Sequence, residues 1–200
     1  NPKTRDARYH SDDGELIALG VTPRPYQKVC PPAYVMAETA GSFRYAGEKG
    51  FRAMCASLSP GRIKEAFTAH NRAISRAQSK EIPFAQGVAV MRPTYVAETV
   101  EEAKEAVRVG ANTLGSWSSV QSHKAMMALL LEEEFEKEDL DLEWFDFQLK
   151  HDMILVGSPT SVSEQIERIR SETGLEHLVL FLNFPGLSFG QVLNSLDLFS

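Results

Sequence analysis

Apolar runs alternate with amphipathic segments along most of the chain. The runs that predict strands are 33–37, 52–56, 84–91 and 177–184. They lack polar alternation, which is typical of strands buried on both faces of a parallel sheet. The strand–helix order repeats about four times, and this predicts parallel strands joined by right-handed crossovers.

Capping residues mark where the helices between these strands begin and end. Thr99 with Glu102 forms a capping-box pattern. Ser158 followed by Pro159 begins a helix that Gly174 ends. Pro93 is expected to end the strand before it, because proline cannot donate a backbone hydrogen bond. The predicted helices are 43–49, 62–78, about 99–109, 125–138, 159–173 and about 188–199.

Two segments show no regular pattern. Residues 1–22 are polar and are expected to form an irregular lead-in, and residues 115–119 have the composition of a loop. The remaining pattern fits one α/β domain over residues 1–200. Four βα units make half of an eight-stranded barrel, and an open four-stranded sheet is the alternative. Periodicity does not decide between the two.

Composition excludes several classes of function. The formal net charge is -6 and no run of Lys or Arg is present, which argues against nucleic acid as a partner. No apolar stretch approaches the ~20 residues that span a bilayer, and the amino terminus has no signal-peptide core. Cys30 and Cys55 lie far apart and form no C-x-x-C pair, so reduced thiols in a cytoplasmic protein are expected and a zinc site is not.

Three ordered stretches are more specific than any single motif. They are Pro23–Lys28 with Pro31–Pro32 leading into 33–37, then Ala37–Ala46 closed by Gly50, and finally Val156–Pro159 through Glu164–Ile166 and Thr173–His177 to Phe184. In order and spacing they resemble the bacterial luciferase-like flavin monooxygenases. The resemblance covers nearly the whole chain and corresponds to the C-terminal half of that family's barrel, from strand five to strand eight.

The resemblance implies a TIM barrel that uses reduced FMN and O2 to oxidise a small organic substrate, with a separate flavin reductase as partner. The N-terminal half of the barrel is absent from this sequence, which does not begin with Met, so a fragment or processed chain is expected. Two alternatives remain: an F420-dependent oxidoreductase of the same superfamily, and a non-catalytic flavin-binding relative. Because a half-barrel leaves strands without partners, poor solubility or a homo- or hetero-oligomer is expected.

The candidate cofactor residues lie where the first buried strand meets its helix. The resemblance places Glu38, Thr39 and Ser42 at the FMN phosphate, and a helix N-terminus at the active-site end of a barrel suits an anion. Glu38 is expected to contribute its backbone N–H or to pair with an arginine that also contacts the phosphate. The alternative is that Thr39 and Ser42 only cap the helix.

Other candidates have strong structural alternatives. Trp144 is a candidate for the substrate pocket, but with Phe145 and Phe147 it also suits a core cluster. Trp117 is a weaker candidate. Arg92 can face a phosphate or a substrate acid, although an ordinary loop arginine is favoured. The sequence identifies no catalytic residue and no metal ligands, and it does not specify the substrate.

Overall fold

The computed structural model describes residues 9–11, 14–16, 26–27, 31–116 and 135–200. The chain divides into two compact units, residues 1–32 and 33–200. In the first unit, β1 (Tyr9–Ser11) and β2 (Gly14–Leu16) form an antiparallel two-stranded sheet. The expectation of an irregular lead-in was therefore wrong for these residues, because segments too short and polar to show a strand pattern still pair with each other.

The second unit is built on a five-stranded sheet, and every strand pair in it is parallel, as predicted. Its strands are β3 (Tyr34–Met36), β4 (Arg52–Cys55), β5 (Val88–Val96), β6 (Leu155–Gly157) and β7 (Leu178–Phe181). The sequence did not predict β6, since the four-residue apolar run before Gly157 is too short to distinguish from a loop.

The long central strand β5 pairs with three other strands. β4 pairs with residues 88–90, β7 with 90–93 and β6 with 94–96. Successive residues of a strand direct their N–H and C=O groups to opposite edges. The Gly87 carbonyl accepts from Ala53, the Ala97 N–H donates to Gly157, and the Val90 N–H donates to His177. Odd-numbered residues therefore face β4 and β6 on one edge, and even-numbered residues face β7 on the other.

This arrangement explains why the strand continues through Pro93. The missing N–H of this odd-numbered residue falls in the gap between the end of β4 and the start of β6, where no ladder bond is required. On the other edge β7 ends at Phe181 opposite Pro93. Beyond it the Val96 N–H donates to Ser195 Oγ at 2.8 Å. The prediction that Pro93 ends the strand was therefore wrong.

Seven helices of the described residues accompany the strands. They are α1 (Ala40–Glu48), α2 (Pro60–Gln78), α3 (Val100–Ser116), α5 (Lys137–Leu140), α6 (Trp144–Lys150), α7 (Pro159–Thr173) and α8 (Phe189–Phe199). The capping box of Thr99 and Glu102 is confirmed at 3.2 Å in both directions. Ser158 and Gly174 (φ +71°) cap α7 as predicted. The predicted helix 125–138 lies mostly outside the described residues.

Helix α3 extends to Ser116, so the expected loop at 115–119 was wrong for its first two residues. Glycine is needed in this helix because other segments approach it closely. A Cβ at Gly110 would lie 2.5 Å from the Pro185 carbonyl oxygen, and one at Gly115 would lie 2.5 Å from Trp144 Cδ1. Here close packing outweighs the low helix propensity of glycine.

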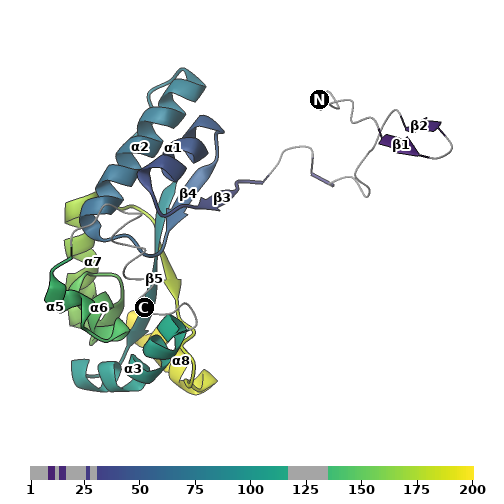
Figure 1. Cartoon of the computed structure of the whole chain (residues 1–200). Coiled ribbons are helices and arrows are strands. Elements are labelled where there is room, and N and C mark those ends of the chain that lie inside the picture. Colours follow the sequence, from purple (N-terminus) through teal and green to yellow (C-terminus); the bar gives the residue numbers. More distant parts are fainter. Residues whose placement is uncertain (1–8, 12–13, 17–25, 28–30, 117–134) are drawn as a thin grey trace. The chain divides into compact units, whose positions relative to one another are not determined.

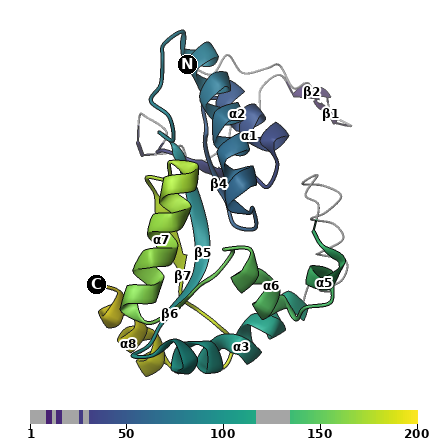
Figure 2. The ribbon, with the colours of Figure 1, turned by 90° about the vertical axis from the view of Figure 1, so that its left-hand side faces the viewer.

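Helices α1, α2 and α7 cover one face of the sheet (Figure 2). Their buried residues, including Phe43, Phe67 and Ile169, pack against sheet residues such as Ala53 and Val90. A second cluster joins α3 and α6 to the carboxyl-terminal part of β5 and to β6. Helices α1 and α2 lie side by side at one end of this unit, and α3 and α8 lie at the other (Figure 1).

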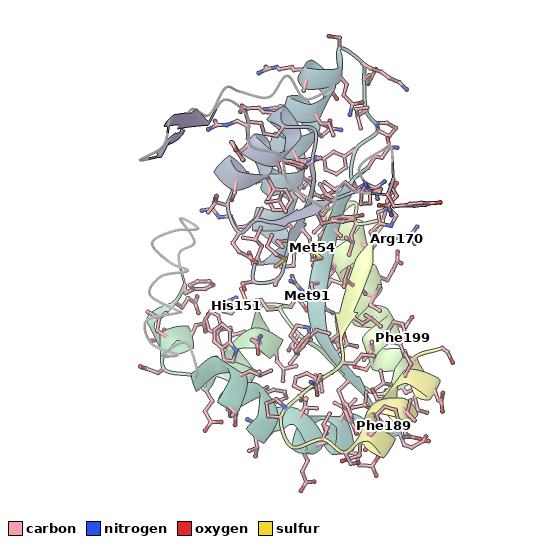
Figure 3. All side chains as sticks on the ribbon, turned by 90° about the vertical axis from the view of Figure 1, so that its right-hand side faces the viewer. Met54, Met91, His151, Arg170, Phe189 and Phe199 are labelled. Carbon is pink, nitrogen blue, oxygen red and sulfur yellow. The ribbon has the colours of Figure 1, made fainter. Side chains whose placement is uncertain are left out.

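The opposite face of β3, β4 and β7 remains open. Tyr34, Met36 and Val179 are 41%, 51% and 39% exposed. Met54 and Met91 lie beside them on neighbouring strands and are partly buried (Figure 3). Within the described residues β3, β6 and β7 each pair along one edge only. An apolar inner face with unpaired strand edges is what part of a closed barrel presents.

Candidate functional site

The turn between β3 and α1 is organised by a pair of hydroxyl groups. Thr39 is the N-cap of α1, with extended backbone angles. Its Oγ1 accepts from the Ser42 N–H at 3.1 Å, and Ser42 Oγ accepts from the Thr39 N–H at 3.2 Å. The two hydroxyl oxygens are 2.7 Å apart. The capping interpretation is confirmed, and it leaves open whether the same groups also bind an anion.

Two backbone donors of this helix start remain available. Within the described residues the N–H groups of Ala40 and Gly41 have no hydrogen-bond partner. They are orphan donors of the first helical turn, where the helix dipole also favours negative charge. A cavity of about 470 Å³ beside Ala40 is also lined by Lys64, Glu65 and Arg72, so its lining carries charges of both signs. The two N–H groups and the two hydroxyls of the turn form a donor set that fits a phosphate group.

The Glu38 carboxylate binds backbone and not arginine. Its Oε1 accepts from the Ala56 N–H at 2.8 Å and its Oε2 from the Ser57 N–H at 3.0 Å. Burial raises the pKa of Glu38, while these two donors and the charge of Arg92 act in the opposite direction. Glu38 therefore holds the segment after β4 against the turn after β3. No direct hydrogen bond joins it to Arg92 among the described residues.

Arg92 is a fully buried cation at the gap in the β4–β6 edge, with an exposed fraction of 0%. Its Nη1 donates to the Ala56 carbonyl at 2.8 Å, its Nη2 to Leu58 at 2.6 Å, and its Nε to Asp152 at 2.9 Å. Asp152 adopts φ +53°, a left-handed conformation that Asp tolerates better than most residues. Both expected roles of Arg92, an anion ligand and an ordinary loop arginine, were therefore wrong.

Glu38 and Arg92 together fix the segment that follows β4. Glu38 accepts from its N–H groups and Arg92 donates to its carbonyls, so Ala56 is bonded from both sides. This arrangement joins the segments that follow β3 and β4 to the middle of β5, and through Asp152 to the segment that precedes β6. Sequence reasoning missed it because a backbone-binding arginine leaves no motif. The one signal was a charged residue inside an apolar strand.

Trp144 lies in the core and also lines a small cavity. It is 9% exposed and stacks on Phe147 with ring centroids 5.6 Å apart. The cavity is about 180 Å³ and is also lined by Pro93, Leu114 and Phe184. That volume is below the range of about 300–1,000 Å³ usual for ligand pockets. The core packing predicted as the alternative is thus present, and Trp117 lies outside the described residues.

The described residues contain no group of three or more His, Cys, Asp or Glu side chains able to hold a metal. Cys55 is buried and free, and burial raises its pKa to about 12. Such a thiol is not a nucleophile at neutral pH. Cys30 lies outside the described residues. Burial lowers the pKa of His70, whose Nε2 lies 2.9 Å from the Phe51 carbonyl oxygen.

A family model described as luciferase-like monooxygenase matches residues 6–177. No curated protein matches the chain. Monooxygenase RslO1 from Streptomyces bottropensis has a similar solved structure, with 20% identity, a TM-score of 0.64, and coverage of 97% of this chain and 54% of that one.

Two further solved structures share the fold. One is the oxygenating constituent of 3,6-diketocamphane monooxygenase from the CAM plasmid of Pseudomonas putida, in complex with FMN. It has 21% identity and a TM-score of 0.64, over 84% of this chain and 46% of that one. The other is an F420-dependent secondary alcohol dehydrogenase with an F420-acetone adduct. It has 16% identity and a TM-score of 0.55, over 88% and 49%.

The chain thus spans about half the length of these structures. The fold prediction, a partial barrel with parallel strands, is confirmed. In the part of the chain that the structure describes, no helix has the length and apolar character required to cross a membrane.

Proposed function

The chain belongs to the luciferase-like monooxygenase family, and we propose that it carries the phosphate-binding turn of a flavin site. The enzyme would use reduced FMN and O2 to oxidise a small organic substrate. One observation carries the proposal: the start of α1 presents two unpaired N–H groups beside the Thr39 and Ser42 hydroxyls. A helix N-terminus with hydroxyl donors is a recurring phosphate site.

Each group in the turn has a distinct role in this proposal. The Ala40 and Gly41 N–H groups donate to phosphate oxygens, and the two hydroxyls rotate to donate as well. Glu38 acts through the backbone of Ala56 and Ser57, and so holds the turn in place. Reduced flavin supplies the electrons that activate O2, and the protein's part is to orient it and exclude water. The open apolar face beside Met54 and Met91 suits an aromatic ring system.

Two alternatives stay within the same family. F420 also carries a phosphate, and a similar structure holds an F420-acetone adduct, so a deazaflavin oxidoreductase is the second candidate. The third is a flavin-binding relative without turnover, which fits a chain that has about half of a barrel. A flavin reductase partner and a cytoplasmic location belong to the first proposal.

Titration of the protein with FMN tests the proposal. The double variant Thr39→Ala, Ser42→Ala is expected to weaken FMN binding by about 1–3 kcal/mol, or roughly 5- to 150-fold in Kd, because charge-assisted hydrogen bonds are lost. Flavin fluorescence quenching measures the binding.

The matched control is Thr99→Ala, which removes a capping hydroxyl from α3, far along the chain from the turn. Thr99→Ala should lower the free energy of unfolding by about as much as each hydroxyl removed from the turn, and it should leave the affinity for FMN unchanged. Equal affinity of the wild type and the double variant would reduce the turn to a helix cap. Binding of F420 without binding of FMN would favour the second candidate.

A further inference from the structure

The outer surface of α1 and α2 carries a basic groove. A hollow of about 570 Å³ is lined by Arg44, Glu48, Ala69, Arg72, Ala73, Arg76 and Ala77. Glu48 is within 3.8 Å of Arg44. Arg72 and Arg76 form no ion pair with any described residue. In a chain of net charge -6, this is a local concentration of unpaired positive charge.

The floor of the groove is made of small side chains. Ala69, Ala73 and Ala77 follow one another four residues apart on α2, and Arg72 and Arg76 form the neighbouring row with the same spacing. Rows of residues four apart are the ridges and grooves through which helices pack. Ala73 is only 6% exposed because it lies against Gly47 of α1, so Ala69 and Ala77 are the members of the row that remain accessible in the groove.

The same chain presents a matching ridge on α3. Glu101, Glu105 and Val109 are also four residues apart. Glu101 and Glu105 are exposed and lack an ion pair within the described residues, and Val109 is 75% exposed. The buried side of α3, including Ala103 and Val107, faces its own core, so the ridge points away from it.

We propose that the α3 ridge of one copy docks into the α1–α2 groove of a second copy. In an antiparallel arrangement Glu101 meets Arg76, Glu105 meets Arg72, and Val109 lies over Ala69. The spacing agrees along both helices, and Arg–carboxylate pairs favour this register. Helices α1 and α2 lie at one end of this unit and α3 lies at the other (Figure 1), so the α3 ridge of a chain cannot dock into the groove of the same chain. The contact is heterologous.

Charge reversal on each side tests the contact. The groove variant is Arg72→Glu, Arg76→Glu, and the ridge variant is Glu101→Arg, Glu105→Arg, which leaves the capping bond of Glu102 intact. Each variant alone should associate about tenfold more weakly than the wild type, because attraction becomes repulsion. Mixed together they should regain wild-type association, since the ridge of the first still matches the groove of the second. Sedimentation velocity at low and high salt measures this.

The matched control is Lys80→Glu, Arg170→Glu, which changes the net charge by the same amount as the groove variant and lies outside the groove lining. Circular dichroism confirms that each variant is folded. Salt-sensitive association restored only in the mixture supports the proposal. The proposal is overturned if the wild type does not associate at low salt. It is also overturned if neither charge reversal changes the association, or if the control variant weakens it as much as the groove variant does.

Discussion

The Arg92 side chain holds two chain segments to β5, the one after β4 and the one before β6. It donates to the carbonyls of Ala56, Leu58 and Asp152 from a fully buried position. Replacing Arg92 with Met removes these donors and leaves buried carbonyls without partners. We expect a loss of about 3–5 kcal/mol in the free energy of unfolding, measured by urea denaturation.

Arg168→Met serves as the control for this experiment. Arg168 pairs with the Asp152 carboxylate at the surface, and exposed pairs contribute at most about 1 kcal/mol. If Arg92→Met were as stable as Arg168→Met, the hydrogen bonds of Arg92 to Ala56, Leu58 and Asp152 would not stabilise the fold as inferred.

His70 makes the stability depend on pH. Burial lowers its pKa below 6.5, and its Nδ1 has no partner among the described residues. Below pH 6.5 the unfolded state therefore binds more protons at this site, and stability falls as pH decreases toward the folded-state pKa. Burial also lowers the pKa of His151. Both histidines therefore contribute to the slope of the wild-type unfolding free energy against pH.

The variant His70→Gln separates these contributions. It keeps an N–H donor for the Phe51 carbonyl and does not titrate, so the slope of unfolding free energy between pH 6.5 and 5 should decrease. Urea denaturation at a series of pH values measures it. An unchanged slope in the variant would assign the pH dependence to other groups.

The contact between α1 and α2 depends on the absence of a side chain at Gly47 of α1. A Cβ at Gly47 would lie 2.7 Å from the His70 carbonyl oxygen and 2.9 Å from Ala73 Cβ. Gly61, in the first turn of α2, has open space around it. We expect Gly47→Ala to destabilise by about 1–3 kcal/mol and Gly61→Ala to be neutral or to stabilise by up to about 1 kcal/mol.

Thermal or urea unfolding of the two variants checks this difference. Both substitutions replace glycine with alanine in a helix and so raise helix propensity alike. Opposite signs of their effects on the free energy of unfolding would therefore isolate the close approach of α1 and α2. Stabilisation by Gly47→Ala would mean that α1 and α2 are not packed this tightly.

Helices and strands could be predicted where capping residues or apolar runs within the segment itself marked them. Ser158, Pro159 and Gly174 marked α7 correctly, and the apolar runs found β3, β4 and β7. The long course of β5 was not predictable, because it depends on which edge of the strand Pro93 faces. In the site, the Thr39–Ser42 cap followed from sequence. The roles of Glu38 and Arg92 did not, since they bind backbone that only the fold brings near.

At the scale of the whole molecule, the described part of the sheet has an open apolar face, and β3, β6 and β7 each pair along one edge only. Met36, Tyr34 and Val179 are exposed on this face, and the similar structures are about twice as long. We expect this chain alone to be poorly soluble or to oligomerise through the face. Multi-angle light scattering of Met36→Lys, Val179→Lys should show a larger monomer fraction than the wild type.

Salt separates this association from the one proposed for α3. Apolar contacts persist or strengthen at high salt, whereas contacts between charges weaken. A monodisperse wild-type monomer with cooperative unfolding would show that the face tolerates water.

We propose above all that the turn after β3 binds a flavin through its phosphate. The most direct measurement compares the affinities of the protein for FMN and for riboflavin, which differ only in that phosphate, in the wild type and in Thr39→Ala, Ser42→Ala. We expect the wild type to bind FMN more tightly than riboflavin by about tenfold or more, and we expect this preference to be smaller in the double variant. Equal affinity for the two flavins in the wild type would contradict it.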